Sequence, residues 1–192
     1  SQVNTSPGDI WFVNVNGDDV INDFDRTVIG NPQPDFIFGF NNQFGYKNFD
    51  LSIFFQGSYG NDIWNGVRVS HEGMESTYNQ FTSTLNRWNG KGSSNTMPRA
   101  IYADPNRNNR ASTRWVEDGS YLRLKNLTFG YRFTQDWLKK IGAKSLRLYL
   151  SFDNLWTLTN YSGLDPEVGL WGLDYGIYPT SRVYMFGASV KF

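Results

Sequence analysis

Every second residue from Tyr184 to Phe192 is apolar, and the residues between them are mostly small or polar. Successive side chains of an extended strand point to opposite faces, so this segment predicts a strand with two unlike faces. One face would carry Tyr184, Phe186, Ala188, Val190 and Phe192, and the other Met185, Gly187, Ser189 and Lys191. Such a strand suits either a soluble β-sandwich or a transmembrane β-barrel with an apolar outside and a wet lumen.

Four further segments alternate in the same way, and each is about as long as a tilted strand that crosses a bilayer. They are residues 35–46, 49–59, 119–133 and 145–161. In the first segment four phenylalanines oppose glycines and amides, a distribution that is typical of lipid on one side and water on the other. The sequence therefore predicts an all-β chain with about five antiparallel transmembrane strands.

The third segment breaks its own pattern near Lys125. Leu127, Phe129 and Tyr131 share a face, and strict alternation would place Arg123 and Lys125 on that same face. Two interpretations are open. A β-bulge near Lys125 switches the alternation, or the two cations lie above the hydrocarbon layer.

The connections alternate in length, which indicates how the strands are oriented. The long ones are residues 60–118 and 162–181, and the short ones are a turn at 47–48 and residues 134–144. Outer-membrane barrels have long extracellular loops and short periplasmic turns. We therefore expect residues 1–35 to form an extracellular loop. Residues 36–192 should form the carboxy-terminal strands, with residues 60–118 and 162–181 as long extracellular loops between them. Five strands cannot close a membrane barrel, so we expect the carboxy-terminal part of a larger one.

Composition narrows the class of protein. The mean hydropathy is −0.51 and no long apolar run is present, although 17% of the residues are aromatic. A transmembrane helix is therefore not expected, but strands with alternating residues remain allowed. The net charge of zero gives no reason to expect a nucleic-acid partner. The absence of cysteine excludes disulfides and thiolate metal sites within this sequence.

Residues 14–25 match the spacing of a calcium-binding loop. Oxygen-bearing side chains fall at positions one, three, five, nine and twelve, and the carbonyl of position seven completes the set. The candidate ligands are Asn14, Asn16, Asp18, Val20, Asn22 and Asp25. Position one lacks a carboxylate and position six is Asp19 instead of glycine. The alternative is an Asx-rich turn held by hydrogen bonds from the backbone.

Aromatic residues in the long connections are candidates for stacking on sugar rings. The ligand set that we predict is Trp64, Trp88, Trp171 and Tyr175. The alternative is that they belong to an interfacial aromatic belt or pack within the loops. Asp165 and Glu167 stand two residues apart in a loop rich in proline and glycine, which gives no sign of a glycosidase pair across a cleft. We therefore expect no enzymatic activity.

Several stretches together carry a resemblance to a known family. The most specific is Trp-Val-Glu-Asp-Gly-Ser-Tyr-Leu-Arg-Leu-Lys-Asn at residues 115–126, and the others are residues 7–10, 14–26, 29–32, 34–36, 49–52, 55–57, 153–155 and 161–167. The chain resembles the carboxy-terminal end of SusC/RagA-type TonB-linked outer-membrane proteins of Bacteroidetes.

The resemblance implies the last strands of a plugged barrel of roughly 22 strands in the cell outer membrane. It implies import of glycans or oligosaccharides, or of peptides, in a SusCD-type complex. The implied partners are a SusD-like surface lipoprotein, the TonB complex acting through an amino-terminal plug, the rest of the barrel and outer-membrane lipid. The alternative from another class is a soluble, carbohydrate-binding β-sandwich at the cell surface, with calcium ordering a loop.

Overall fold

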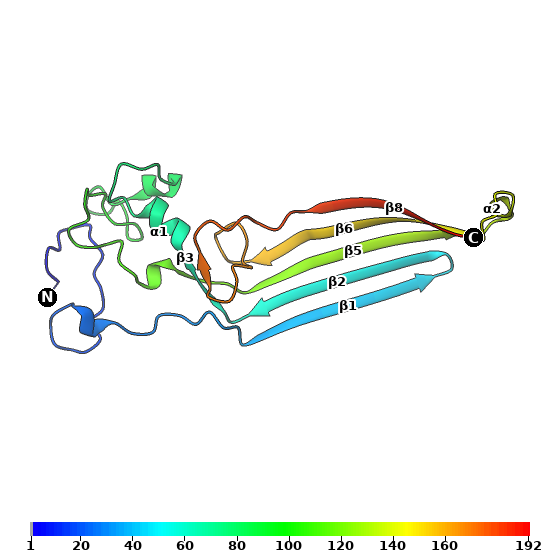
Figure 1. Cartoon of the computed structure of the whole chain (residues 1–192). Coiled ribbons are helices and arrows are strands. Elements are labelled where there is room, and N and C mark those ends of the chain that lie inside the picture. The colour runs from blue at the N-terminus through cyan, green and yellow to red at the C-terminus, as the bar shows by residue number, and fades with distance from the viewer. Residues whose placement is uncertain (1) are drawn as a thin grey trace.

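The computed structural model of the chain describes residues 2–192. Its main feature is a single long sheet of five antiparallel strands, in which each strand pairs with the next long strand along the sequence (Figure 1). These strands are β1 (Phe36–Tyr46), β2 (Phe49–Tyr59), β5 (Tyr121–Phe133), β6 (Ser145–Thr159) and β8 (Val183–Lys191). The five predicted antiparallel strands are confirmed. The sheet is open, with β1 and β8 at its two edges.

Strand register gathers the apolar residues into continuous rows on one face of the sheet. One row that crosses all five strands consists of Phe44, Leu51, Phe129, Leu150 and Phe186. The adjacent row on the opposite face consists of Gln43, Ser52, Thr128, Ser151 and Met185. The aromatic face is thus a property of the whole sheet, because residues that face the same way in separate strands are also neighbours across strands.

The apolar rows are not covered by protein. Phe186 is 71% exposed, Phe44 57% and Leu150 44%, and Figure 1 shows the long strands without a second layer. A β-sandwich would bury this face against another sheet. Within residues 2–192 the only second sheet is small and is made by the connections, so the sandwich alternative is wrong for this part of the chain.

A β-bulge at Lys125 explains the broken alternation in β5. Phe54 pairs with Asn126 and Phe55 pairs with Leu124, so Lys125 is the extra residue on its strand. The bulge switches the faces on either side of it. Leu124 joins the apolar face and Arg123 turns to the polar face, where its residue is only 3% exposed. Of the two interpretations, the bulge is confirmed.

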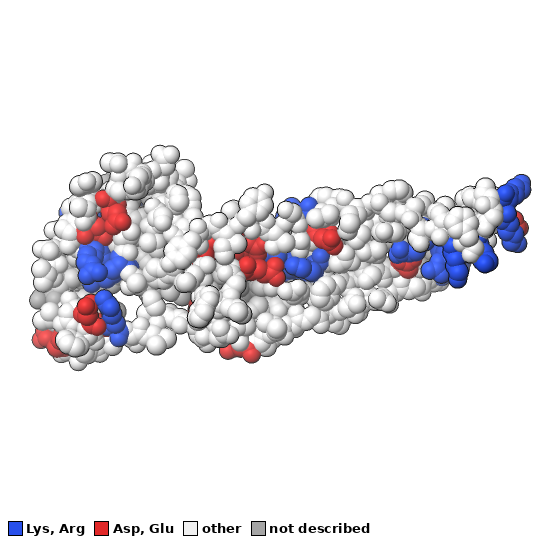
Figure 2. All heavy atoms as spheres, in the orientation of Figure 1, with Lys and Arg blue, Asp and Glu red and all other residues white. Residues whose placement is uncertain are grey.

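The connections alternate in length and lie at opposite ends of the sheet. The β1–β2 turn and the β5–β6 connection lie at the same end of the sheet as the carboxy terminus (Figure 1). The β5–β6 connection contains the short helix α2 (Asp136–Lys139). Lys47 in the tight turn has φ +54°. Figure 2 shows that cations gather at this end, where the α2 region carries Lys139, Lys140 and Lys144. None of the helices among residues 2–192 is long and apolar enough to cross a membrane.

The long connections fold on each other at the other end of the sheet. They contain a small sheet in the order β4-β3-β7 and one α-helix. The elements are β3 (Asp62–Asn65), α1 (Gly66–Glu72), β4 (Val116–Asp118), β7 (Leu173–Asp174) and the 3-10 turns Asp23–Asp25, Thr82–Asn86 and Thr113–Trp115. The buried apolar cluster of Ile63, Tyr161 and Val168 lies in this part. The compact core of the chain is therefore in its connections, and the long sheet has none.

Candidate functional site

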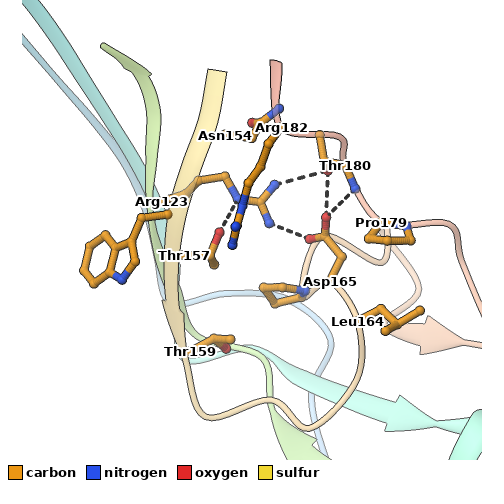
Figure 3. A pocket seen from close by; sticks show the side chains of 11 residues that line it. Arg123, Asn154, Thr157, Thr159, Leu164, Asp165, Pro179, Thr180 and Arg182 are labelled. Carbon is orange, nitrogen blue, oxygen red and sulfur yellow. Dashed lines mark hydrogen bonds and ion pairs between the residues drawn. The ribbon is translucent and has the colours of Figure 1, made fainter. Parts of the chain in front are cut away.

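Arg123 occupies the polar face of β5 at the end where the long connections begin. The bulge at Lys125 places it there, opposite Gln56 of β2. Its Nε donates a hydrogen bond of 2.9 Å to Thr157 Oγ1 on β6, and its Nη2 donates one of 2.6 Å to Asp165 Oδ1 (Figure 3). Its Nη1 donates to Glu167 Oε2. One buried guanidinium thus joins the strands to the loop that follows β6.

Asp165 accepts four hydrogen bonds through its carboxylate. Burial raises its pKa, but hydrogen bonds from Thr180 Oγ1, from the backbone N–H groups of Glu167 and Thr180 and from Arg123 outweigh burial and lower the pKa to about 2. The Thr180 hydroxyl lies 2.7 Å from Asp165 Oδ2. The carboxylate therefore ties the two ends of the 162–181 loop to Arg123 and stays ionised at neutral pH.

Glu167 fastens the same loop to a second strand. Its Oε1 accepts hydrogen bonds from the Tyr121 hydroxyl over 2.8 Å and from Gln56 Nε2 over 3.1 Å. Lys125, the bulged residue, lies with its Nζ 3.5 Å from Glu167 Oε2. The loop between β6 and β8 is therefore anchored on the polar face of β2 and β5, which is the face that would line a lumen.

A second polar network links the two long connections. Glu117, at the start of the 115–126 motif, accepts from Arg68 Nη1 over 2.8 Å, from Ser162 N over 2.8 Å and from Asn65 Nδ2 over 3.1 Å. Burial raises its pKa, but the bond from Arg68 and those from Ser162 lower it by more. Tyr161 extends this network, since its hydroxyl donates to Asp174 Oδ2 over 2.6 Å.

A cavity of about 360 Å³ opens beside the Arg123 anchor. Its walls come from the polar face of β5 and β6 and from both ends of the 162–181 loop (Figure 3). Asp165 lines it, but this carboxylate accepts from Arg123 and has a pKa of about 2. Glu167 does not line the cavity and also accepts from Arg123, so the two carboxylates do not stand across this cavity as a glycosidase pair.

The four aromatic residues predicted as ligand contacts do not form one cluster. Trp64 lies on β3, whose backbone pairs with β7 in the loop that also carries Trp171 and Tyr175. Trp171 is 81% exposed and Tyr175 73%. Trp88 lies elsewhere, with its ring packed against Gly8. Stacking on a sugar stays a prediction for each of them.

The candidate calcium loop has the hydrogen bonds of consecutive Asx turns. Asn14 Oδ1 accepts from Gly17 N, Asn16 Oδ1 from Asp18 N, and Asp18 Oδ1 from Val20 N. Both oxygens of Asp25 accept from backbone N–H groups, those of Val15 and Asn22 at 2.7 and 2.8 Å. In a calcium loop the residue at position twelve offers both oxygens to the ion.

Asp25 would therefore have to exchange backbone hydrogen bonds for a metal, and this part of the donor set fits calcium poorly. Asp19, at position six, does adopt φ +65°, the left-handed conformation for which glycine is usual there. Residues 2–192 contain no group of three His, Cys, Asp or Glu side chains placed to hold a metal. Calcium binding stays a prediction.

Sequence reasoning missed the Arg123 anchor. The sequence marks Arg123 by the broken alternation and Asp165 with Glu167 as two nearby loop carboxylates, but it gives no sign that the two sites meet. The structure brings residues 115–126 and 161–167 together, because Arg123 and Glu117 of the first stretch bind Asp165, Glu167 and Ser162 of the second. The signal that was available was the broken alternation at Arg123.

Comparison with known proteins agrees with this geometry. The chain is 39% identical to the TonB-dependent receptor P3 of Formosa agariphila over 98% of its own length and 19% of the receptor. It is 29% identical to the TonB-dependent receptor SusC of Bacteroides thetaiotaomicron, again over 98% of this chain and 18% of SusC. No family model matches the sequence.

Among solved structures, the RagAB peptide importer in its closed-closed state superposes with a TM-score of 0.75 at 26% identity, covering 86% of this chain and 18% of that one. The chain is part of a SusC/RagA-type TonB-dependent receptor. The antiparallel sheet is accordingly a partial barrel of this receptor type. The chain spans about one-fifth of the length of the curated receptors that it matches. Because the matched relatives are receptors, the expectation that the chain is no enzyme is confirmed.

Proposed function

We propose that the complete receptor imports nutrients across the outer membrane in a TonB-dependent manner. The observation that carries this proposal is the register of the five long strands, which makes one face apolar and exposed and the other polar and lined by Arg123, Asn126 and Asp153. A sheet of that kind suits a barrel wall between lipid and a wet lumen. The similarity to SusC and to RagAB supports the same activity.

The cargo that we propose is an oligosaccharide, with a peptide as the alternative. The oligosaccharide follows from the resemblance to SusC/RagA-type proteins, and the similarity to the RagAB peptide importer supports the alternative. We further propose that the receptor works with a SusD-like surface lipoprotein and that TonB acts through the part of the receptor outside this chain. In this arrangement residues 1–35, 60–118 and 162–181 lie on the extracellular side.

The Arg123 anchor has a defined place in this function. It fixes the 162–181 loop against the lumen face of the wall, so the loop narrows the extracellular mouth instead of moving freely. Ordered loops of this kind set which molecules enter a barrel, since selectivity follows from the shape and polar groups of the opening.

The experiment is nutrient uptake by a strain that lacks the receptor gene. The strain is complemented with the full receptor, or with a receptor that lacks only its TonB-contacting segment, and is given labelled oligosaccharides or labelled peptides. We expect uptake with the full receptor and none with the truncated one. Equal uptake by both receptors would indicate a passive pore, and no uptake of either cargo class by the full receptor would reject import.

The partner is tested separately. A full receptor with an affinity tag, purified from native membranes in mild detergent, should bring a surface lipoprotein in a fixed ratio. A receptor that purifies alone while still importing cargo would reject the complex and leave import standing.

A further inference from the structure

A second cavity, of about 500 Å³, lies among the long connections. Its walls are residues 8–11 on one side and the 94–98 segment with Trp88 and Arg114 on the other. Its volume is in the range of pockets that hold small organic ligands. Trp11 is 69% exposed at this cavity, and Trp88 offers a second indole.

The two walls of this cleft are fixed to each other. Arg99 Nε donates to Asp9 Oδ1 over 2.7 Å and Arg99 Nη2 to Asp9 Oδ2 over 3.0 Å, which is a paired, fork-like contact. The backbone N–H of Arg99 also donates to Gly8 O over 2.8 Å. The Asp9 side chain is completely covered. The cleft therefore has a preformed shape, and the carboxylate of Asp9 in its wall is already paired with Arg99.

Arg114 is the unusual residue of the cleft. It is half-buried, and among residues 2–192 its Nε is covered and has no hydrogen-bond partner. Its Nη2 lies 2.8 Å from the Met97 thioether, a weak acceptor, and its guanidinium lies 4.5 Å from the Trp115 ring centroid. Arg68, Arg99 and Arg123 contact carboxylates. The half-buried Arg110 contacts none, but it donates to the carbonyl oxygens of Arg107 and Asn106.

No described carboxylate is free to pair with Arg114. Glu72 and Asp104 lie near enough to act on it through space. The two oxygens of Glu72 accept from Arg68 Nε and from Ser83 Oγ, and those of Asp104 accept from the backbone N–H groups of Asn108 and Asn109. Burial of a charge without a counter-charge is costly and calls for a partner. Because Arg114 Nε is covered, a carboxylate in the open cleft would supply the counter-charge through the Nη groups of the guanidinium.

We propose that this cleft binds a carboxylate-bearing ligand, with Arg114 as the counter-charge and the Trp11 and Trp88 rings against the body of the ligand. The size of the cleft and its two indoles favour an organic carboxylate over a small inorganic ion. The identification of this ligand as imported cargo rests on the proposed import function. Binding itself does not, because it depends only on the cleft.

The carboxylate could belong to a peptide or to an acidic oligosaccharide, and two pairs of probes distinguish these sources. The peptide pair is tetra-alanine and its carboxy-terminal amide, and the oligosaccharide pair is trigalacturonate and its methyl ester. Each is titrated against the purified full receptor in detergent, with intrinsic tryptophan fluorescence or calorimetry as the readout. We expect the acid of one pair to bind roughly tenfold to hundredfold more tightly than its neutral form, the value of a charged hydrogen-bonded contact.

The variant Arg114→Gln should remove this preference for the acid and leave a weak affinity for the neutral form. Arg107→Gln is the matched control, because Arg107 is exposed and does not line the cleft. Both variants are first shown to be folded by the mobility of the unheated receptor on a gel. Trp11→Ala should weaken the acid and the neutral form alike.

Failure of both acids to bind, or an unchanged preference in Arg114→Gln, overturns the proposal. Equal binding of inorganic phosphate and of the acids would also overturn it, since the organic body would then contribute nothing. Because these measurements need no transport, a receptor that binds the acid but imports nothing separates this proposal from the import function.

Discussion

Arg147 on β6 reaches over β5 to Asp50 on β2. Its Nε donates to Asp50 Oδ1 over 2.9 Å, and the pair passes directly above Gly130. A Cβ at Gly130 would lie 2.6 Å from Asp50 Oδ2 and 2.7 Å from Arg147 Nη2. The ion pair thus joins three strands on the polar face, and glycine is required because any side chain would occupy its path.

Replacement of Gly130 by valine should break this contact and lower the stability of the barrel. We expect a loss of about 1–3 kcal/mol, mostly from steric overlap, since an ion pair as solvated as this one contributes little by itself. The measurement is the temperature at which the folded receptor band disappears on a gel. Gly45→Val is the control, because nothing lies within 4 Å of a Cβ at Gly45, and equal losses in both variants would contradict the role of Gly130.

Replacement of Arg123 by glutamine should release the 162–181 loop. Asp165 would then keep a buried charge without its cationic partner, a change that costs about 3–5 kcal/mol locally. We expect proteinase K to cut this loop in intact cells that carry the variant and to spare it in the wild type. Arg132→Gln is the control from the same strand, since Arg132 is exposed and forms no ion pair among the described residues. A protected loop in Arg123→Gln would refute the anchor.

Acid should weaken the same anchor within a defined range of pH. The pKa of Asp165 falls from 3.8 to about 2 on folding, so its contribution is complete above the unfolded value and is lost as the pH drops through the folded one. We expect the free energy of unfolding to fall by about 2 kcal/mol more in the wild type than in Asp165→Asn between about pH 4 and pH 2. Denaturant titrations in detergent at the two pH values measure this, and parallel losses in both proteins would be inconsistent with the assignment.

Calcium binding by residues 14–25 is tested on the intact receptor by calorimetric titration. If the sequence pattern is functional, calcium should bind with release of the Asp25 hydrogen bonds to Val15 and Asn22, and Asp18→Asn should weaken binding at least tenfold by removing one of two carboxylates. Absence of heat in the wild type would establish the Asx-turn alternative.

The long strands were predictable from the sequence because each carries its own alternating pattern. The predicted segments 35–46 and 49–59 agree almost to the residue with the observed strands of the first hairpin, Phe36–Tyr46 and Phe49–Tyr59. The bulge at Lys125 was one of two interpretations that the sequence allowed. The pattern indicates that Arg123 and Lys125 break the alternation, but it does not distinguish a bulge from two cations that lie above the hydrocarbon layer. Only the pairing of Phe54 with Asn126 and of Phe55 with Leu124 decided it.

The polar anchors were not predictable, for a physical reason. Arg123 meets Asp165 across 42 residues and Glu117 meets Ser162 across 45, and no periodic signal encodes such contacts. The small β4-β3-β7 sheet has strands of two to four residues, too short for an alternating pattern. Contacts between distant loops depend on the sheet that brings the loop ends together.

The central claim is that the two faces of the long sheet meet different solvents. Spin labels at Thr128 and at Phe129 of the full receptor in lipid vesicles test it, with collision rates measured for oxygen, which enters lipid, and for a nickel chelate, which stays in water. The label at Phe129 should collide with oxygen and not with nickel, and the label at Thr128 should show the reverse. Nickel access equal at both positions, or shielding of Phe129 from oxygen, would contradict the assignment of the apolar face to lipid.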